Sequence, residues 1–100
     1  MIQGTTPIHT FNIPFSTDIV KNVRITYAQN GNVLLTKELV DCDVEGRSIS
    51  CRLTQNDTFA FDHAFPVDIQ LRVLTIDDDA FATRLYRVSI EEVQDGEVLE

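Results

Sequence analysis

One stretch, Pro66–Ile76, alternates apolar and polar side chains along most of its length. The apolar residues at every second position are Val67, Ile69, Leu71 and Val73. Successive side chains of a strand point to opposite faces of a sheet, so this period predicts a central strand with one buried face. Leu74 and Ile76 then fall on the other face, which indicates that this end is covered on both sides or meets a partner.

The chain has 100 residues, which suits one domain with one hydrophobic core and leaves no room for a separate catalytic domain. Its hydrophobic content of 43% and charged content of 24% argue against disorder. We expect a single domain over residues 1–100. The segments 1–7 and 94–100 are polar and contain Gly4, Pro7 and Gly96, so they are expected to be loose termini.

The charge balance narrows the possible partners. Sixteen Asp and Glu against eight Lys and Arg give a formal net charge of −8. Phosphate backbones and anionic lipids need a basic face, so we expect neither nucleic acid nor a membrane surface as partner. No apolar run approaches the roughly 20 residues that span a bilayer, and the N-terminus lacks the pattern of a signal peptide. These features predict a cytoplasmic protein that is not secreted by a signal peptide.

Six other short segments also show strand-like alternation: 8–15, 23–28, 33–39, 42–44, 49–53 and 80–93. No amphipathic helix, repeat or low-complexity tract interrupts them. About seven short strands separated by turn residues predict an all-β fold, an antiparallel immunoglobulin-like β-sandwich. The Cys, Trp and Cys spacing of true immunoglobulin domains is missing, because the chain has no Trp.

Two turns set strand registers. At Gln29–Gly31, a three-residue loop with a bulge would place Tyr27 opposite Val33 and keep one face apolar, so we expect it in place of a two-residue loop. A two-residue loop at Gly46-Arg47 would place Cys42 directly opposite Cys51.

Three further elements are expected between residue 54 and the C-terminus. Thr54 and Asp57 have the spacing of a capping box around a single 3₁₀-like turn. The next segment would deliver three aromatic side chains to the core, and these are Phe59, Phe61 and Phe65. Residues 80–93 would form one last strand, with Phe81 and Leu85 on one face. Its other face would carry Ala82, Arg84, Tyr86, Val88 and Ile90.

No group of residues has the spacing of an active site or a cofactor site. A reducing cytoplasm favours two buried thiols at Cys42 and Cys51 over a disulfide, and a zinc site needs more ligands. His9 and His63 stand alone without a nucleophile in recognisable spacing. Asp77–Asp79 is typical of a solvated hairpin tip rather than a calcium loop. We therefore predict a protein that is not an enzyme and holds neither cofactor nor metal.

Four segments carry a family resemblance: Met1–Pro7, Val23–Gly31, Leu53–Phe59 and Ile69–Thr75. Through them the chain resembles small uncharacterised proteins encoded in phages and prophages of Gram-positive bacteria, over nearly its full length. It is more distantly similar to the N-terminal sandwich module of phage baseplate upper proteins. This resemblance implies a structural or assembly protein associated with the tail or baseplate, located in the virion or in the host cytoplasm during assembly. It brings no catalytic residues with it.

Two functional classes follow. A structural module would bind other phage structural proteins, or a second copy, through an exposed edge strand. The expected edge is Ile8–Phe15, because Pro14 lacks a ladder donor. Its expected contact residues are Ile8, Thr10, Asn12 and Pro14. The alternative is a small-ligand or carbohydrate-binding sandwich, with Tyr27, Tyr86 or a Phe lining a groove.

Overall fold

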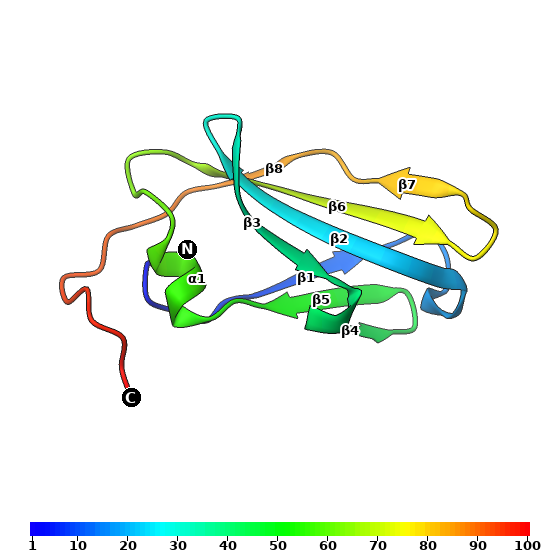
Figure 1. Ribbon diagram of the computed structural model, residues 1–100, viewed down its shortest axis with the longest axis horizontal. Coiled ribbons are helices and arrows are strands. Elements are labelled where there is room, and N and C mark those ends of the chain that lie inside the picture. Colours follow the sequence, from blue (N-terminus) through cyan, green and yellow to red (C-terminus); the bar gives the residue numbers. More distant parts are fainter.

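The computed structural model describes residues 1–100 and shows two antiparallel β-sheets packed face to face (Figure 1). The smaller sheet has the order β1-β5-β4. The larger has the order β3-β2-β6, with β7 and β8 both paired to β6. The strands are β1 (Ile8–Asn12), β2 (Val20–Gln29), β3 (Asn32–Glu38), β4 (Cys42–Glu45), β5 (Ser48–Arg52), β6 (Val67–Thr75), β7 (Ala80–Ala82) and β8 (Tyr86–Val88). The helical turns are η1 (Thr17–Ile19), η2 (Leu39–Asp41) and α1 (Gln55–Phe59). The predicted antiparallel β-sandwich is confirmed.

The core lies between the sheets, and β6 supplies its centre. The four alternating apolar residues of β6 are all buried, as their period predicted. They meet the inner faces of β2, β1 and β5, whose buried residues are Val23, Ile25, Tyr27, Phe11, Ile49 and Cys51. On the outer face Leu74 is half-buried and Ile76 is exposed, so no second layer of the chain covers this end of β6.

The hairpin between β2 and β3 differs from the predicted register. Asn30 and Gly31 have φ values of 53° and 80° and form a two-residue turn, with Gln29 opposite Asn32. Positive φ at both positions matches the twist of the flanking strands. The extra residue sits inside β3 at Leu34, and it sets Tyr27 opposite Leu35. A bulge was therefore correctly predicted but wrongly placed in the loop, and the predicted pairing of Tyr27 with Val33 was wrong.

The hairpin between β4 and β5 has the predicted two-residue loop. Glu45 pairs with Ser48, and Cys42 lies opposite Cys51. Gly46 occupies the left-handed region at φ 57°, where a side chain would be strained.

Residues 80–93 do not form one strand. Ala82 pairs with Arg72 and Tyr86 with Ile69, so one more residue lies between the pairs on this segment than on β6. Thr83 occupies the break, where its amide donates to the Leu71 carbonyl at 2.9 Å and its hydroxyl accepts from the Leu71 amide at 3.1 Å. The break reverses the side-chain phase. Phe81, Tyr86 and Val88 pair with buried residues of β6. The prediction that Phe81 lies on the face opposite to Tyr86 and Val88 was therefore wrong.

The first seven residues are not a loose arm. The Met1 ammonium donates to the Ser89 carbonyl at 2.7 Å, and the amides of Gln3 and Glu91 donate to the carbonyls of Glu91 and Met1 at 2.9 and 2.8 Å. These bonds form a short parallel bridge that the polar composition of the segment did not predict. Residues 94–100 extend away from both sheets (Figure 1), held through Leu99, whose amide donates to the Gln55 side chain at 2.8 Å.

Residues 54–65 connect β5 of the smaller sheet to β6 of the larger one. The predicted capping box at the start of this segment is present, but the predicted burial of all three Phe side chains is not. The Thr54 hydroxyl accepts from the Asp57 amide at 3.1 Å and the Asp57 carboxylate accepts from the Thr54 amide at 2.8 Å, around an α-helical rather than a 3₁₀ turn. Phe61 is buried and Phe59 is half-buried, but Phe65 is 42% exposed and does not belong to the core. With five residues, α1 is the one α-helix, and no helix has the length and apolar character to cross a membrane.

Candidate functional site

β1 forms one edge of the smaller sheet, with β5 on one side and no strand on the other. The Leu53 amide donates to the Pro7 carbonyl and the Ile13 amide to the Arg47 carbonyl, each at 2.9 Å. Hydrogen-bonded and non-hydrogen-bonded pairs alternate along an antiparallel ladder, so the odd-numbered residues of β1 bond to β5. The N–H and C=O groups of the even-numbered residues therefore point toward the open edge.

The same even-numbered residues carry exposed side chains on the outer face. Ile8 is 62% exposed, and Thr10, Asn12 and Pro14 are also exposed. Pro14 follows the end of β1 and has no N–H, so it limits the available ladder to Ile8–Asn12. The structure thus places the four predicted contact residues along one sheet edge.

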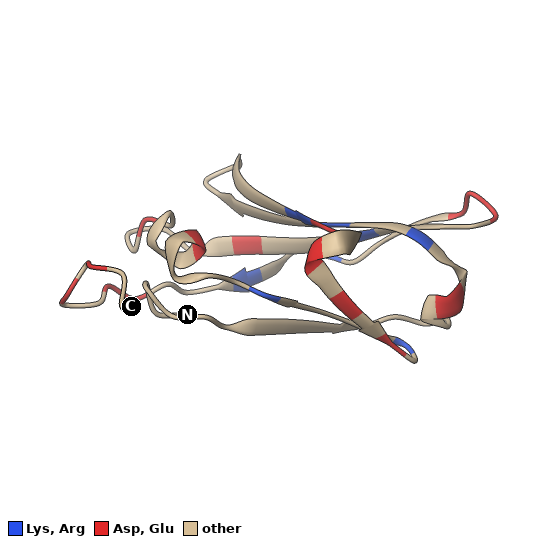
Figure 2. Cartoon of the chain, turned by 60° about the horizontal axis from the view of Figure 1, so that its bottom comes forward, with Lys and Arg blue, Asp and Glu red and all other residues tan.

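This edge is also free of charge. The first seventeen residues contain no Asp, Glu, Lys or Arg, although the whole chain carries −8. Figure 2 shows the acidic and basic positions on other strands and turns, and none on the N-terminal strand. This signal can be read directly from the sequence, but strand periodicity alone did not find it.

The other edges carry the features that discourage strand addition. β4 has four residues, of which Asp43 and Glu45 are acidic. β3 is interrupted by its bulge at Leu34, and the edge formed by β7 and β8 is broken at Thr83. β1 alone is continuous and uncharged.

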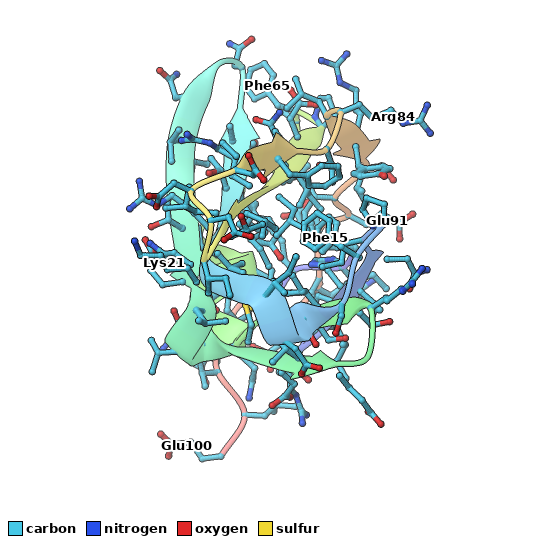
Figure 3. The ribbon with its side chains drawn as sticks, turned by 90° about the vertical axis from the view of Figure 1, so that its right-hand side faces the viewer. Phe15, Lys21, Phe65, Arg84, Glu91 and Glu100 are labelled. Atoms are coloured by element: carbon cyan, nitrogen blue, oxygen red, sulfur yellow. The ribbon has the colours of Figure 1, made fainter.

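A groove of about 390 Å³ runs between β1 and the facing edge of the larger sheet. It is lined by Ile8, His9, Thr10, Phe11, Asn12, Ile69 and Tyr86. The rings of Phe11 and Tyr86 lie 6.0 Å apart across it, and the Arg84 guanidinium lies 5.5 Å from the Tyr86 ring centre. Tyr86 is 41% exposed, so the groove offers an aromatic surface beside polar side chains. Nearer the far end, Phe15 packs edge-on against Phe81 at 5.7 Å, between the layers seen end-on in Figure 3.

Beneath this groove, His9 is held by the buried Tyr27. His9 Nδ1 lies 2.7 Å from the Tyr27 hydroxyl. Burial lowers the pKa of His9, and the nearby N-terminal charge lowers it further. Burial also raises the pKa of Tyr27, helped by the neighbouring thiols and Asp57. At neutral pH the uncharged imidazole and the hydroxyl therefore share a hydrogen bond that links β1 to β2. His63 has a different partner, since its Nε2 lies 3.7 Å from an Oε2 of exposed Glu92.

The opposite side of the sandwich, formed by β3 and β4, is closed by charge. Lys37 Nζ lies 2.9 Å from Asp57 Oδ2, and both side chains are about 15% exposed, at 16% and 15%. Burial opposes charge on both groups, but their mutual attraction prevails and raises the pKa of Lys37. The Thr54 amide and Lys37 together lower the pKa of Asp57. The pair ties β3 of the larger sheet to α1, which follows β5 of the smaller sheet.

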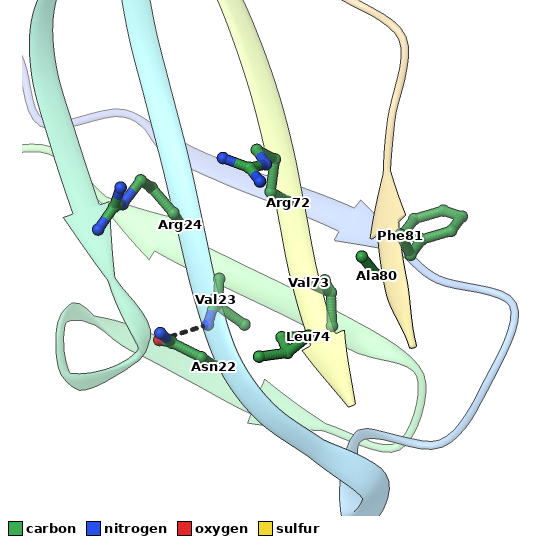
Figure 4. A pocket seen from close by; sticks show the side chains of 8 residues that line it. All are labelled: Asn22, Val23, Arg24, Arg72, Val73, Leu74, Ala80 and Phe81. Atoms are coloured by element: carbon green, nitrogen blue, oxygen red, sulfur yellow. Dashed lines mark hydrogen bonds between the residues drawn. The ribbon is translucent and has the colours of Figure 1, made fainter. Parts of the chain in front are cut away.

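A second, shallower hollow of about 220 Å³ lies on the larger sheet (Figure 4). Arg24 and Arg72 are opposite each other in β2 and β6, and Arg24 Nε donates to Glu38 Oε1 at 2.9 Å. The neighbouring Asn22 side chain accepts from the Val23 amide at 2.9 Å and is thereby occupied. Its lining comes mainly from β2 and β6, each of which has a paired strand on both sides.

The acidic tip at Asp77–Asp79 is a hairpin turn. Asp78 has φ 64°, and its carboxylate lies 3.3 Å from Lys21 Nζ, with both side chains exposed. No three His, Cys, Asp or Glu side chains gather closely enough to hold a metal ion.

The sequence matches no protein-family model, and comparisons with curated proteins and with solved structures found no match.

Proposed function

We propose that this chain is a non-enzymatic structural or assembly module of a phage tail or baseplate, acting through protein–protein contacts along β1. The phage context is supported by the sequence resemblance. The contact surface is supported by one observation above all, a continuous uncharged edge strand whose outward N–H and C=O groups have no partner in the chain. The partner is another phage structural protein or a second copy.

Strand addition follows from this geometry. An extended segment laid along β1 would bond to the backbone of Ile8, Thr10 and Asn12, while side chains at its alternate positions would enter the groove. The backbone bonds supply affinity for any extended segment. The groove beside Phe11 and Tyr86 supplies a preference for apolar or aromatic side chains.

A second copy can make this contact symmetrically. With a two-fold axis at Thr10, the Thr10 residues of both copies face each other, and Ile8 of each copy faces Asn12 of the other. These pairs are all even-numbered, so each would form two backbone hydrogen bonds. Adjacent strands lie about 4.8 Å apart, closer than the screening length of about 8 Å at physiological salt. Two chains of charge −8 can approach so closely where the meeting strands are neutral.

Association at micromolar concentration, followed by light scattering and sedimentation velocity, tests the proposal. Thr10→Lys would place two ammonium groups at the two-fold axis, and we expect it to abolish association. Because Thr10 is exposed, the protein should remain folded. Thr36→Lys adds the same charge at an exposed position on β3 and is the matched control. Proteins that co-purify from an induced lysogen are compared for the same variants. The proposal would be overturned if the wild type is monomeric and if Thr10→Lys still co-purifies with the same phage proteins as the wild type, or if neither co-purifies with any.

The groove supports a second candidate function, binding of a small ligand or carbohydrate. Tyr27 is fully buried and cannot serve, but Tyr86 is exposed beside Phe11 with polar Thr10 and Asn12 nearby. Calorimetry with a panel of bacterial cell-surface saccharides tests this candidate. Binding that is lost in Tyr86→Ala and retained in Thr10→Lys would favour it over strand addition, and absence of binding across the panel would reject it.

A further inference from the structure

Cys42 and Cys51 face each other at a position that suits a covalent bond. The odd-numbered residues of β5 bond to β1, so its even-numbered residues bond to β4 on the other side. Cys51 and its partner Cys42 are therefore a non-hydrogen-bonded pair. The Cα atoms of such pairs lie about 4.5 Å apart, inside the range of about 4.4 to 6.8 Å found for disulfides.

Both thiols are free, and the two residues are direct cross-strand neighbours. Cys51 is 2% exposed in the core, and Cys42 is half-buried at the start of β4. The Cys51 thiol donates to the Arg52 carbonyl at 3.9 Å. The pair lies directly after η2, where the chain crosses from one sheet to the other.

We propose that Cys42 and Cys51 are an oxidative modification site, at which a low-molecular-weight disulfide converts the two thiols to an intramolecular disulfide that staples β4 to β5. This inference is independent of the proposed function. Its product would fix the crossover between the sheets beside the Lys37 and Asp57 ion pair.

The reaction balances as two thiol exchanges. The thiolate of Cys42, the more exposed residue, attacks one sulfur of the small disulfide; that S–S bond breaks, and one small thiolate leaves and takes up a proton. The thiolate of Cys51 then attacks the Cys42 sulfur, the mixed disulfide breaks, and the second small thiolate leaves. The protein loses two electrons and two protons, and the small disulfide gains them as two thiols.

The surroundings make the exchange slow. Burial, with the neighbouring Cys51, raises the pKa of Cys42 to about 12, and burial also raises the pKa of Cys51 against the opposing charge of Lys37. The charged and titratable groups around the pair come from several neighbouring elements. They are Lys37, Asp41, Asp43, Asp57, Tyr27 and His9, the last of which is the cross-strand partner of Cys51 on β1. A thiol in this setting persists in a reducing cytoplasm and oxidises after prolonged exposure to an oxidising medium.

Incubation of the purified protein with oxidised glutathione tests the site. We expect an intact mass lower by two hydrogen atoms, loss of both thiols in a thiol assay after unfolding, and a non-reduced peptide joining Cys42 to Cys51. The rate should rise about tenfold per pH unit across the neutral range, because the thiolate is the nucleophile. The urea midpoint of the product should fall when dithiothreitol is added.

Two variants separate the roles of the sulfurs. Cys51→Ala should stop at a glutathione adduct on Cys42, and Cys42→Ala should react more slowly because Cys51 is buried. The urea-unfolded wild type is the control for reagent activity. If the unfolded chain oxidises while the native chain keeps both thiols, or if the native chain gives only adducts or linked dimers, the proposal is overturned.

Discussion

The two long sides of the sandwich are built on different principles. Along β3 and β4, the η2 crossover connects the layers, and an ion pair with 2.9 Å between Lys37 Nζ and Asp57 Oδ2 ties β3 to α1. Along β1 and β8, the layers are bridged by aromatic side chains, and the backbone edge of β1 is left unpaired beside a groove. One side uses a partly buried ion pair to close the fold, and the β1 edge of the other carries no charged residue.

This difference separates stability from recognition. Charged side chains, bulges and short strands prevent foreign strands from pairing with an edge. Those features are present on β3 and β4 and absent from β1. The chain carries its net charge of −8 elsewhere and leaves one continuous uncharged edge open, and this is the edge through which we propose that it binds a partner.

The largest expected effect is on the closed side, in Asp57→Ala. The substitution leaves the Lys37 ammonium 16% exposed without its counterion and also removes the cap of α1. We expect the free energy of unfolding to fall by about 2–4 kcal/mol in urea denaturation. Lys21→Ala, which breaks an exposed pair with Asp78, is the control and should change it by at most about 0.5 kcal/mol. Equal losses in both variants would mean that the closed side is not held by charge.

A smaller loss is expected beneath the groove, in Tyr27→Phe. The substitution removes the hydroxyl that lies 2.7 Å from His9 Nδ1 and leaves that half-buried nitrogen without a partner. The expected cost is about 1–2 kcal/mol in the same denaturation assay. Tyr86→Phe removes a hydroxyl that makes no hydrogen bond within the chain, and it should be neutral. A neutral Tyr27→Phe would show that β1 is held by its ladder to β5 alone.

The sequence predicts those features of the two sides that are set by residues close together in the chain, and it misplaces those that depend on distant strands. The β6 period, the Thr54 capping box and the Cys42 register are set by adjacent residues and by one tight turn, and all three were predicted. The Leu34 bulge and the break at Thr83 depend on which face of a distant strand must stay apolar, so period alone misplaced them. The position of β1 at a sheet edge was predicted through Pro14. The groove was not, because it requires β1 and β8 to meet across two layers.

Acid should weaken the two sides at different pH. The pKa of His9 is lowered by burial and by the N-terminal charge, so the unfolded chain binds that proton more tightly. Its contribution to stability is complete above the ordinary value of 6.5 and declines as the pH falls below it. The pKa of Asp57 is lowered by Thr54 and Lys37 against the effect of burial. That contribution is complete above 3.8 and is lost as the pH falls through the lower folded value.

Urea midpoints measured from neutral pH to below 3.8 should therefore show two separate declines. His9→Gln should remove the upper decline. Asp57→Asn should reduce the lower one, to which Asp68 also contributes because its hydrogen bond with Arg87 lowers its pKa. A single decline that disappears in Asp57→Asn would place the whole acid response on the closed side.

The smallest effect is expected at the groove rim, in Arg84→Ala. The guanidinium lies 5.5 Å from the exposed Tyr86 ring, and such a contact at an exposed site contributes about 0.5 kcal/mol. The chain has two Tyr and no Trp, and Tyr27 is fully buried, so acrylamide quenching of its fluorescence reports on Tyr86. Quenching should increase in Arg84→Ala while the urea midpoint barely moves, and Arg47→Ala at the β4–β5 turn should change neither. A loss of stability as large as that of Tyr27→Phe would mean that a cation holds the open side together. In that case the contacts that line the groove would be needed for the stability of the fold, and the edge of β1 would not be available for pairing with an added strand.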